Sequence, residues 1–126
     1  MVIPLPNEVI VLRYSMVGID IVDVARITRL RETYGDHFLK KVFTDGEISY
    51  VMGKRRSDES FAARFAAKEA FIKVMGKGLG WLEIEICSGE AGRPYILYNG
   101  NRFDSVSLSH ERAYAIAVVS IDGGSP

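Results

Sequence analysis

The chain lacks the features of secreted and membrane-spanning proteins. Its single cysteine, Cys87, excludes an intrachain disulfide and fits a reducing compartment. No apolar run is long enough to span a bilayer. The first seven residues lack the basic region and the small-residue cleavage site of a signal peptide. We therefore expect a cytoplasmic protein with no membrane partner.

Net charge is absent as well, because 16 Lys and Arg residues balance 16 Asp and Glu residues. This balance gives no general reason to expect nucleic-acid binding, although local charged patches remain possible. The 126 residues, 48% of them hydrophobic, suffice for one globular domain with a core. We expect one domain over residues 1–126, in which residues 1–15 form an N-terminal arm and a strand extension.

Helical signals dominate the first half of the chain. Apolar residues recur every three or four positions over residues 22–34, which predicts an amphipathic helix that Gly35 ends. Thr44-Asp-Gly-Glu47 fits a capping box and predicts a short helix over residues 45–52. Ser57 or Asp58 is the expected cap of a long helix that ends near residue 75.

Strand signals dominate the second half. Residues 82–86 alternate between apolar and charged side chains, and residues 94–98, 106–109 and 114–121 are further strand candidates. Asn99-Gly100 is a hairpin turn signal. Residues 9–12 and 16–19 are two short strand candidates near the N-terminus, after an irregular arm over residues 1–8. Early helices and late antiparallel strands predict an α+β fold.

The long helix is the most informative segment, because residues 61–75 are apolar on nearly every side. A helix of this kind is normally buried. Four charged residues nevertheless lie on it, and charged groups are rarely buried without partners. An anionic ligand and a metal ion together would supply partners for all four, which are Arg64, Lys68, Glu69 and Lys73.

Simpler explanations compete with a ligand site. Glu69 and Lys73 have the spacing of a local helix ion pair, worth ~0.3–0.5 kcal/mol. Asp20 lies between a strand and a helix, where a carboxylate is more often a helix cap, and Asp23 competes for that role. The glycine-rich residues 76–80 would let amides approach a phosphate, but a plain connector is the simpler reading.

Two other features have equally simple explanations. A lone histidine such as His110, which follows the strand candidate at 106–109, is more often structural than catalytic. The basic run Lys54-Arg55-Arg56 is most simply a solvated loop, and Trp81 is expected to anchor a core or a subunit interface.

Five segments, taken in order, resemble the small bacterial class of 4′-phosphopantetheinyl transferases over about residues 16–121. The resemblance implies Mg²⁺-dependent transfer of 4′-phosphopantetheine from coenzyme A to a serine of apo-acyl-carrier protein. It also implies release of adenosine 3′,5′-bisphosphate, a role in fatty acid biosynthesis, and a homotrimer with shared active sites. The fold that it implies is α+β, with a long buried helix packed on an antiparallel sheet. The segments are Gly18-Ile-Asp20-Ile-Val22, Phe43-Thr-Asp-Gly-Glu47, Arg64-Phe-Ala-Ala-Lys-Glu-Ala-Phe-Ile-Lys73, Gly92-Arg-Pro-Tyr95 and Ser107-Leu-Ser-His110.

The resemblance implies roles for individual residues. Asp20 and Glu69 match the two metal carboxylates, and oxygen ligands of this kind suit Mg²⁺. Lys73 matches the position that faces the diphosphate, and Glu69 is the first choice for the base that takes the serine proton. Arg64 and His110 match positions near the adenosine 3′-phosphate.

Further positions are expected to bind substrate or partner. We add Lys68, four residues from Arg64, and Gly76 to the coenzyme A positions. Asp45 or Glu47 is a further candidate for positioning substrate. Arg26 matches the arginine that docks the acidic carrier protein, Arg29 lies on the same side of the helix, and Ala25 stands where a lysine is frequent.

Two rival functions remain open at this stage. One is a non-catalytic trimeric module that binds coenzyme A or a nucleotide, and such a module would have no need for both Asp20 and Glu69. The other is Mg²⁺-dependent hydrolysis of a nucleotide diphosphate, for which only Glu69 stands out as an activator of water. The presence of both carboxylates beside Arg64, Lys73 and His110 favours the transferase.

Overall fold

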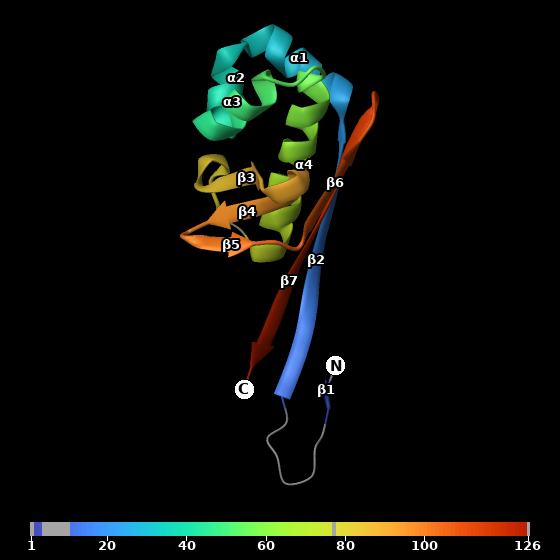
Figure 1. Cartoon of the computed structure of the whole chain (residues 1–126), viewed down its shortest axis with the longest axis vertical. Helices are drawn as coiled ribbons and strands as arrows, with labels where there is room; N and C mark the ends of the chain where they lie inside the picture. Colours follow the sequence, from blue (N-terminus) through green and yellow to red (C-terminus); the bar gives the residue numbers. More distant parts are fainter. Residues whose placement is uncertain (1, 4–10, 77, 126) are drawn as a thin grey trace.

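The computed structural model describes the backbone of residues 2–3, 11–76 and 78–125, and the side chains of residues 15–76 and 78–122 (Figure 1). Two antiparallel sheets lie on either side of one long helix (Figure 1). The first sheet has the order β1 (Val2–Ile3), β2 (Val11–Asp23), β7 (Tyr114–Ser125) and β6 (Val106–His110). The second has the order β3 (Ile84–Ser88), β4 (Pro94–Tyr98) and β5 (Asn101–Phe103).

Strands β2 and β7 form a long two-stranded ribbon that extends beyond the helices (Figure 1). Their pairing runs from Leu12 opposite Ser125 to Asp23 opposite Tyr114. Strand β2 is continuous over residues 11–23. It therefore includes the strand expected at 16–19 and the described part of the strand expected at 9–12. The irregular arm is wrong for Val2–Ile3, which pairs with β2; the rest of that expected arm, and the start of the strand expected at 9–12, lie outside the described residues.

Helix α4 (Ser57–Met75) runs between the two sheets, as the apolar pattern predicts (Figure 1). Phe61, Ala66 and Phe71, which lie on different sides of the helix, are all fully buried. Gly18 lets β2 approach this helix closely, because a Cβ there would lie 2.1 Å from the backbone oxygen of Ala70. The contact brings the next residues of β2 beside the C-terminal half of α4. The buried helix and the α+β class are confirmed.

Local sequence signals correctly predict the ends of one helix and the start of another, but they do not predict the start of α4. Helix α1 (Val24–Tyr34) begins at Asp23, whose carboxylate accepts from the Ala25 amide, and it ends at Gly35 with φ of 58°. The capping box at the start of α3 (Asp45–Met52) is confirmed. The expected cap of α4 is wrong, because Arg56 occupies the cap position without a side-chain hydrogen bond.

A tertiary contact explains that error, and the structure differs from the expectation in two further places. Asp58 accepts hydrogen bonds from Thr28 and Arg31 of α1 instead of capping its own helix. The helix α2 (Asp36–Val42), which buries Phe38, Leu39 and Val42, was not expected. The strand expected from residue 82 begins at Ile84, because Trp81–Glu83 forms a 3-10 turn, η1; a second such turn, η2, spans Glu90–Gly92.

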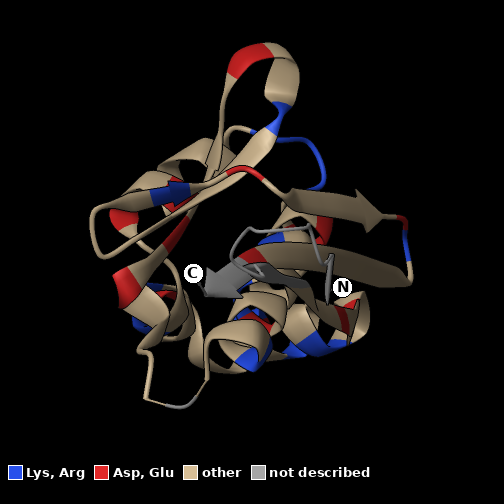
Figure 2. Ribbon diagram, turned by 90° about the horizontal axis from the view of Figure 1, so that it is seen from below, with Lys and Arg blue, Asp and Glu red and all other residues tan. Residues whose placement is uncertain are grey.

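Charges of both signs are interspersed along the chain. Figure 2 shows Lys and Arg positions among Asp and Glu positions, with no division of the molecule into a basic and an acidic half. In the described part of the chain, no helix is both long and apolar enough to cross a membrane. Because charges of both signs are interspersed, any attraction for a charged partner must come from a local group of side chains.

Candidate functional site

Asp20, Glu69 and Lys73 meet where β2 lies against α4. The Lys73 Nζ lies 2.9 Å from Asp20 Oδ1 and donates to the backbone oxygen of Ile19 at 3.0 Å. Asp20 does not cap a helix, because it lies inside β2 and Asp23 caps α1. The ion pair of Lys73 thus joins two elements 53 residues apart and is not the local pair with Glu69 that the spacing favours.

Burial and the neighbouring Asp20 disfavour the charged form of Glu69. The pKa of Glu69 is raised, first by burial and then by the nearby Asp20, while Arg26 and Lys73 oppose the shift. Two close carboxylates are a donor set that fits a hard divalent cation such as Mg²⁺. Among the described residues no group of three His, Cys, Asp or Glu side chains converges to hold a metal. The protein would therefore supply two ligands, and water and substrate oxygens would supply the others.

Lys73 has a freely accessible charge. Its side chain is 54% exposed. The hydrogen bond to Asp20 raises the pKa of Lys73 above its ordinary value, so the ammonium is charged at neutral pH. An exposed ammonium next to two carboxylates is placed to contact an anionic group that enters this site.

Lys68, expected to bind coenzyme A, is directed into the protein core. Its ammonium is fully buried and contacts Glu47 Oε1 at 2.6 Å, the Val42 oxygen at 2.8 Å and the Trp81 oxygen at 2.9 Å. These three acceptors use all three N–H groups. Glu47 is equally buried and is the partner of Lys68 in the core. Asp45 lies exposed in the first turn of α3, and its expected role stays a prediction.

Arg64 is a buried cation with an incomplete set of partners. Its guanidinium lies 4.6 Å from the Tyr50 ring centroid and donates to Ser88 Oγ at 3.1 Å. Its Nε is buried and has no hydrogen-bond partner in the described structure. Burial lowers the pKa of Arg64. Because an unsatisfied buried donor is costly, these features fit a guanidinium that binds an anion.

His110 lies at the other end of α4 within a group of arginines. Its Nδ1 is 3.0 Å from Glu59 Oε1, and Arg56 lies 3.7 Å from the other oxygen of that carboxylate. Arg55, Arg56 and Arg112 line a small cleft beside Glu59. The sequence interpretation of residues 54–56 as a solvated loop missed this group. The sequence signal that could have indicated this group is the position of its arginines. The loop at 54–56 directly precedes α4, and Arg112 follows His110 by two residues.

His110 and Glu69 are far apart within one chain. Glu59 contacts His110, and Glu69 lies ten residues further along α4, a rise of about 15 Å. The strands show the same separation, because β2 and β6 lie on opposite sides of β7. The two predicted halves of the site are therefore not brought together by a single chain.

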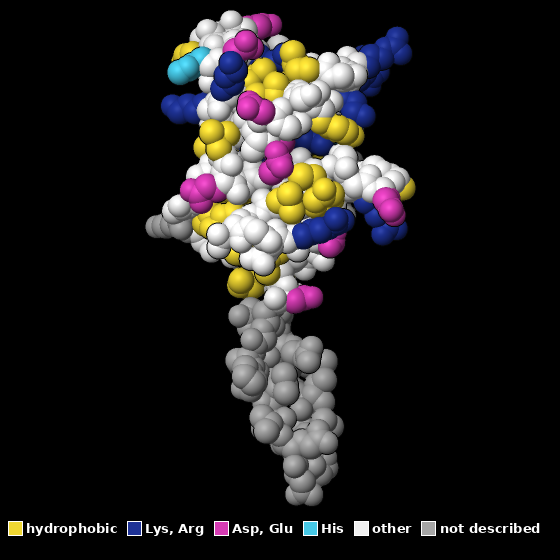
Figure 3. Space-filling model, turned by 60° about the vertical axis from the view of Figure 1, so that its left-hand side comes forward, with side chains coloured by type: hydrophobic (Ala, Val, Ile, Leu, Met, Phe, Trp, Pro, Cys, Tyr) yellow, Lys and Arg dark blue, Asp and Glu magenta, His cyan; other side chains and the backbone are white. Residues whose placement is uncertain are grey.

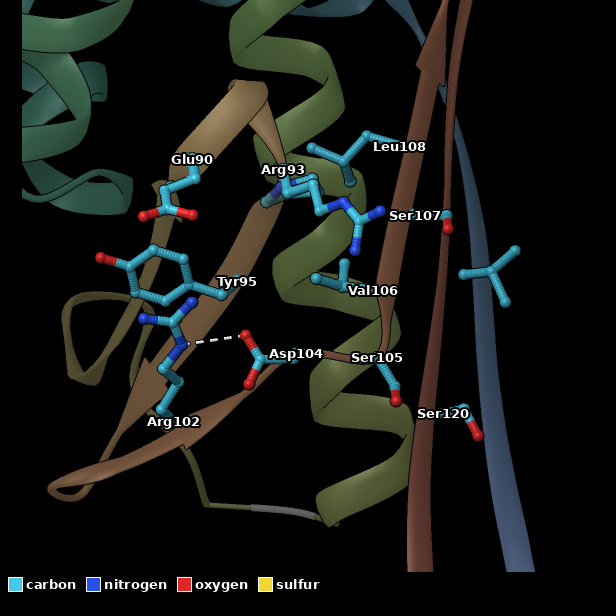
Figure 4. Close-up of a pocket in the computed structure, with 13 residues that line it drawn as sticks. Glu90, Arg93, Tyr95, Arg102, Asp104, Ser105, Val106, Ser107, Leu108 and Ser120 are labelled. Carbon is cyan, nitrogen blue, oxygen red and sulfur yellow. Dashed lines mark hydrogen bonds and ion pairs between the residues drawn. The ribbon is translucent and has the colours of Figure 1, made fainter.

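A larger cleft of about 970 Å³ lies between β6 and the second sheet (Figure 4). The Arg102 guanidinium lies 3.8 Å from the Tyr95 ring centroid and pairs with Asp104 at 2.9 Å. Arg93 extends from the start of β4 toward β6 (Figure 4). Aromatic, cationic and hydroxyl groups in one cleft suit a phosphorylated nucleotide. The lining comprises Gly89, Glu90, Arg93, Pro94, Tyr95, Arg102, Asp104, Ser105, Val106, Ser107, Leu108, Val118 and Ser120.

The predicted docking residues lie exposed on α1, close to Glu69. The Arg26 guanidinium lies 5.4 Å from the Phe65 ring centroid, and its charge opposes the upward shift of the Glu69 pKa. Arg29 is exposed on the same helix. On the face shown in Figure 3, basic side chains lie over the helical end among hydrophobic and acidic ones. A basic group at the edge of the carboxylate site is thus present despite the zero net charge.

Gly76 uses its amide within the fold. It ends α4 with φ of 106° and donates its N–H to the Ile72 oxygen at 2.8 Å. That amide is therefore used within the helix, and the expected contact of Gly76 with coenzyme A stays a prediction. The connector interpretation fits Gly76 better, while Lys77 lies outside the described residues.

The family model of the 4′-phosphopantetheinyl transferase superfamily matches residues 16–119. The chain therefore belongs to this superfamily. Its relatives include the holo-[acyl-carrier-protein] synthase of Chloroherpeton thalassium, 45% identical over 116 residues that cover 84% of this chain and 96% of that protein. That of Chlamydia trachomatis serovar D is 44% identical over 113 residues, covering 81% and 94%. Within the superfamily, the chain is an enzyme of the holo-[acyl-carrier-protein] synthase group.

Solved structures give the same result. The Bacillus anthracis holo-(acyl-carrier-protein) synthase in complex with CoA (3′,5′-ADP) has a TM-score of 0.75 and 30% identity, covering 85% of this chain and 95% of that one. The Helicobacter pylori enzyme in complex with coenzyme A has a TM-score of 0.73 and 31% identity, covering 86% and 100%. The resemblance and the fold expected from the sequence are confirmed.

Proposed function

We propose that this enzyme transfers 4′-phosphopantetheine from coenzyme A to a serine of apo-acyl-carrier protein in an Mg²⁺-dependent reaction. Adenosine 3′,5′-bisphosphate is the second product, and fatty acid biosynthesis in the cytoplasm is the expected context. The observation that carries the proposal is the convergence of Asp20, Glu69 and Lys73 beside an exposed basic helix. Relatives whose structures contain coenzyme A support it.

The three site residues divide the chemistry. Asp20 and Glu69 would hold Mg²⁺, which would supply positive charge against the diphosphate of coenzyme A and its leaving group. Lys73 donates to the same diphosphate. The serine oxygen forms a bond to the phosphorus that bears the pantetheine arm, and the bond from that phosphorus to the bridging oxygen breaks. Glu69 receives the serine proton, directly or through one water.

The other anionic end of coenzyme A requires a second basic group. Arg64, with its unpartnered Nε, and His110, with the arginines around Glu59, are the candidates for the adenosine 3′-phosphate. The cleft beside Tyr95 is the candidate for the nucleotide. Because His110 lies far from Glu69 in one chain, a complete site takes Glu69 from one subunit and His110 from another.

A homotrimer would supply that neighbouring subunit. Side chains alternate along a strand, and Gly18 faces α4, so its neighbours in β2 face away from the helix. Val17, Ile19 and Ile21 are 64%, 55% and 62% exposed. Tyr114, opposite Asp23 in β7, continues this face and is 52% exposed. A contiguous apolar face of this kind marks an interaction surface, and we assign it to subunit contacts.

The acidic carrier protein docks on α1 in this proposal. Arg26 and Arg29 are exposed there, and a local basic group steers an acidic partner even when the net charge is zero. Ala25 removes one expected cation, so docking depends more strongly on Arg26. The position of Arg26 near Glu69 brings the docked carrier to the carboxylates.

Mass spectrometry of apo-acyl-carrier protein tests the reaction directly. The carrier is incubated with this enzyme, coenzyme A and Mg²⁺, with and without EDTA. A metal-dependent gain of one phosphopantetheine group on the carrier serine is the expected result. Release of adenosine 3′,5′-bisphosphate without carrier modification would indicate hydrolysis, and coenzyme A binding without turnover by several carriers would indicate a binding module.

A further inference from the structure

The Lys68–Glu47 ion pair is a completely satisfied polar group in the protein core. Glu47 Oε1 accepts from Lys68 and from the Thr44 amide at 2.8 Å, and Oε2 accepts from the Ile86 amide at 2.8 Å. Lys68 also donates to backbone oxygens at the end of α2 and in η1. One pair of side chains therefore holds together α2, α3, α4, η1 and β3.

Stability alone is a weak explanation for such a pair. Removing two charges from water is expensive, and well-packed apolar side chains of similar volume are often as stabilising or more so. What an ion pair adds is geometry, since its directional bonds hold specific backbone atoms in place. The question is then which of the five segments benefits from being held.

Of these elements, η1 is the one reached from α4 through glycines. Gly76 and Gly78 adopt positive φ, and a third glycine, Gly80, directly precedes Trp81. Where η1 begins, the Trp81 oxygen accepts from Lys68 and the Trp81 ring stacks on Phe65 at 5.0 Å with an angle of 17° between the planes. Lys68 thus anchors the far end of the glycine-rich segment to the catalytic helix.

The ring on which Trp81 stacks, Phe65, also contacts the docking arginine. Phe65 lies one helical turn before Glu69, and the Arg26 guanidinium lies over the Phe65 ring. Lys68, Trp81, Phe65 and Arg26 therefore form a continuous series of contacts from the core to the surface of α1. A shift of Trp81 would remove the support beneath Phe65 and change the position of Arg26.

We propose that Lys68 is a positioning residue for the carrier-protein substrate, which acts by fixing Trp81 against Phe65, the ring that Arg26 contacts. The proposal rests on the proposed function, because it assumes that Arg26 receives the carrier. It assigns Lys68 no contact with either substrate. Loss of the anchor should raise the KM for apo-carrier protein and leave the KM for coenzyme A nearly unchanged.

The test variant is Lys68→Met combined with Glu47→Gln, which removes both charges and leaves no unpaired one in the core. Trp81 is the only tryptophan of the chain, so its fluorescence reports the anchor directly. We expect a red-shifted emission, stronger acrylamide quenching and a KM for apo-carrier protein roughly tenfold higher. Val119→Ala, a core truncation in β7, controls for general loss of stability and should change none of these.

Two further variants keep the result interpretable. Glu47→Gln alone leaves the bond from Lys68 to Trp81 in place and should retain the normal KM for the carrier. Trp81→Ala removes the ring itself and should raise that KM even if the double variant fails to fold. Unchanged fluorescence in the double variant, or an unchanged carrier KM in Trp81→Ala, would overturn the proposal.

The outcome separates this proposal from the proposed function. If the unmodified enzyme modifies no carrier, the proposed function fails, and the carrier role of Lys68 fails with it. If the enzyme is active but the KM values for carrier and coenzyme A rise equally in the double variant, only the positioning role is refuted.

Discussion

Two lysines five residues apart on α4 show how differently the same side chain is used in this protein. Lys68 is fully buried and gives its three N–H groups to the fold, whereas Lys73 is half-exposed and pairs with Asp20 at the edge of the site. The difference comes from what faces each position. Lys68 faces a carboxylate and two backbone oxygens in the core, whereas Lys73 faces Asp20 of strand β2. A charge on a buried helix is therefore evidence for a partner, and the partner decides whether the charge serves structure or chemistry.

The largest expected effect lies on the chemical side of this comparison, at Glu69. We predict that Glu69→Gln lowers kcat by roughly a hundred- to ten-thousand-fold, the range for a lost proton acceptor, while the protein stays folded. Mg²⁺ should raise the melting temperature of the unmodified protein and leave that of the variant nearly unchanged. Carrier modification followed by mass spectrometry and calorimetric melting measure the two effects. Near-normal turnover would remove both roles assigned to Glu69.

Exchanging each lysine for methionine sharpens the comparison itself. Lys73→Met should lower kcat/KM for coenzyme A about a hundredfold, with under ~1 kcal/mol lost in unfolding free energy because the Lys73 side chain is itself 54% exposed. Lys68→Met leaves the Glu47 carboxylate buried without its cation and should cost about 3–5 kcal/mol. Urea unfolding and steady-state kinetics of both variants provide the measurement. Equal losses of stability would mean that the difference in burial does not determine how much each lysine contributes to the unfolding free energy.

The sequence predicts what is local and misses what depends on distant contacts. The capping box at Thr44, the end of α1 at Gly35 and the hairpin at Asn99-Gly100 all follow from neighbouring residues, and all are present. The cap of α4 is wrong because Asp58 bonds to α1. The buried role of Lys68 could not be predicted, because its backbone acceptors lie 13 and 26 residues away in the chain and no local sequence pattern indicates them.

The candidate site shows the same limit. The order of five short segments is enough to identify the family and to select Asp20, Glu69 and Lys73, which the fold does bring together. Spacing alone favours a helix cap for Asp20 and a local ion pair for Lys73. Neither interpretation takes into account the close approach of β2 to α4 at Gly18. The arginines near His110 were missed because their grouping depends on the return of β6 to the start of α4.

A smaller effect is expected at the docking surface. Arg26→Ala should raise the KM for apo-carrier protein about tenfold and weaken its salt dependence, because one steering charge is lost. The KM for coenzyme A should stay nearly constant. Arg29→Ala, on the same helix but without the contact to Phe65, is the matched control and should have a weaker effect. Equal effects of the two substitutions would assign docking to general charge and remove the special position of Arg26.

The smallest effect concerns stability as a function of pH in the absence of metal. The pKa of Glu69 is raised in the folded protein from an ordinary value of 4.5, by burial and by Asp20. Between these two pKa values the folded state binds more protons than the unfolded state, so stability falls as pH rises through this window. Glu69→Gln should therefore be more stable than the unmodified protein at pH 7 without metal, and the difference should vanish below pH 4.5. Thermal melting from pH 4 to 8 in EDTA measures it, and repeating the series with Mg²⁺ should abolish the advantage, because a cation between Asp20 and Glu69 removes the repulsion that the variant removes by neutralisation.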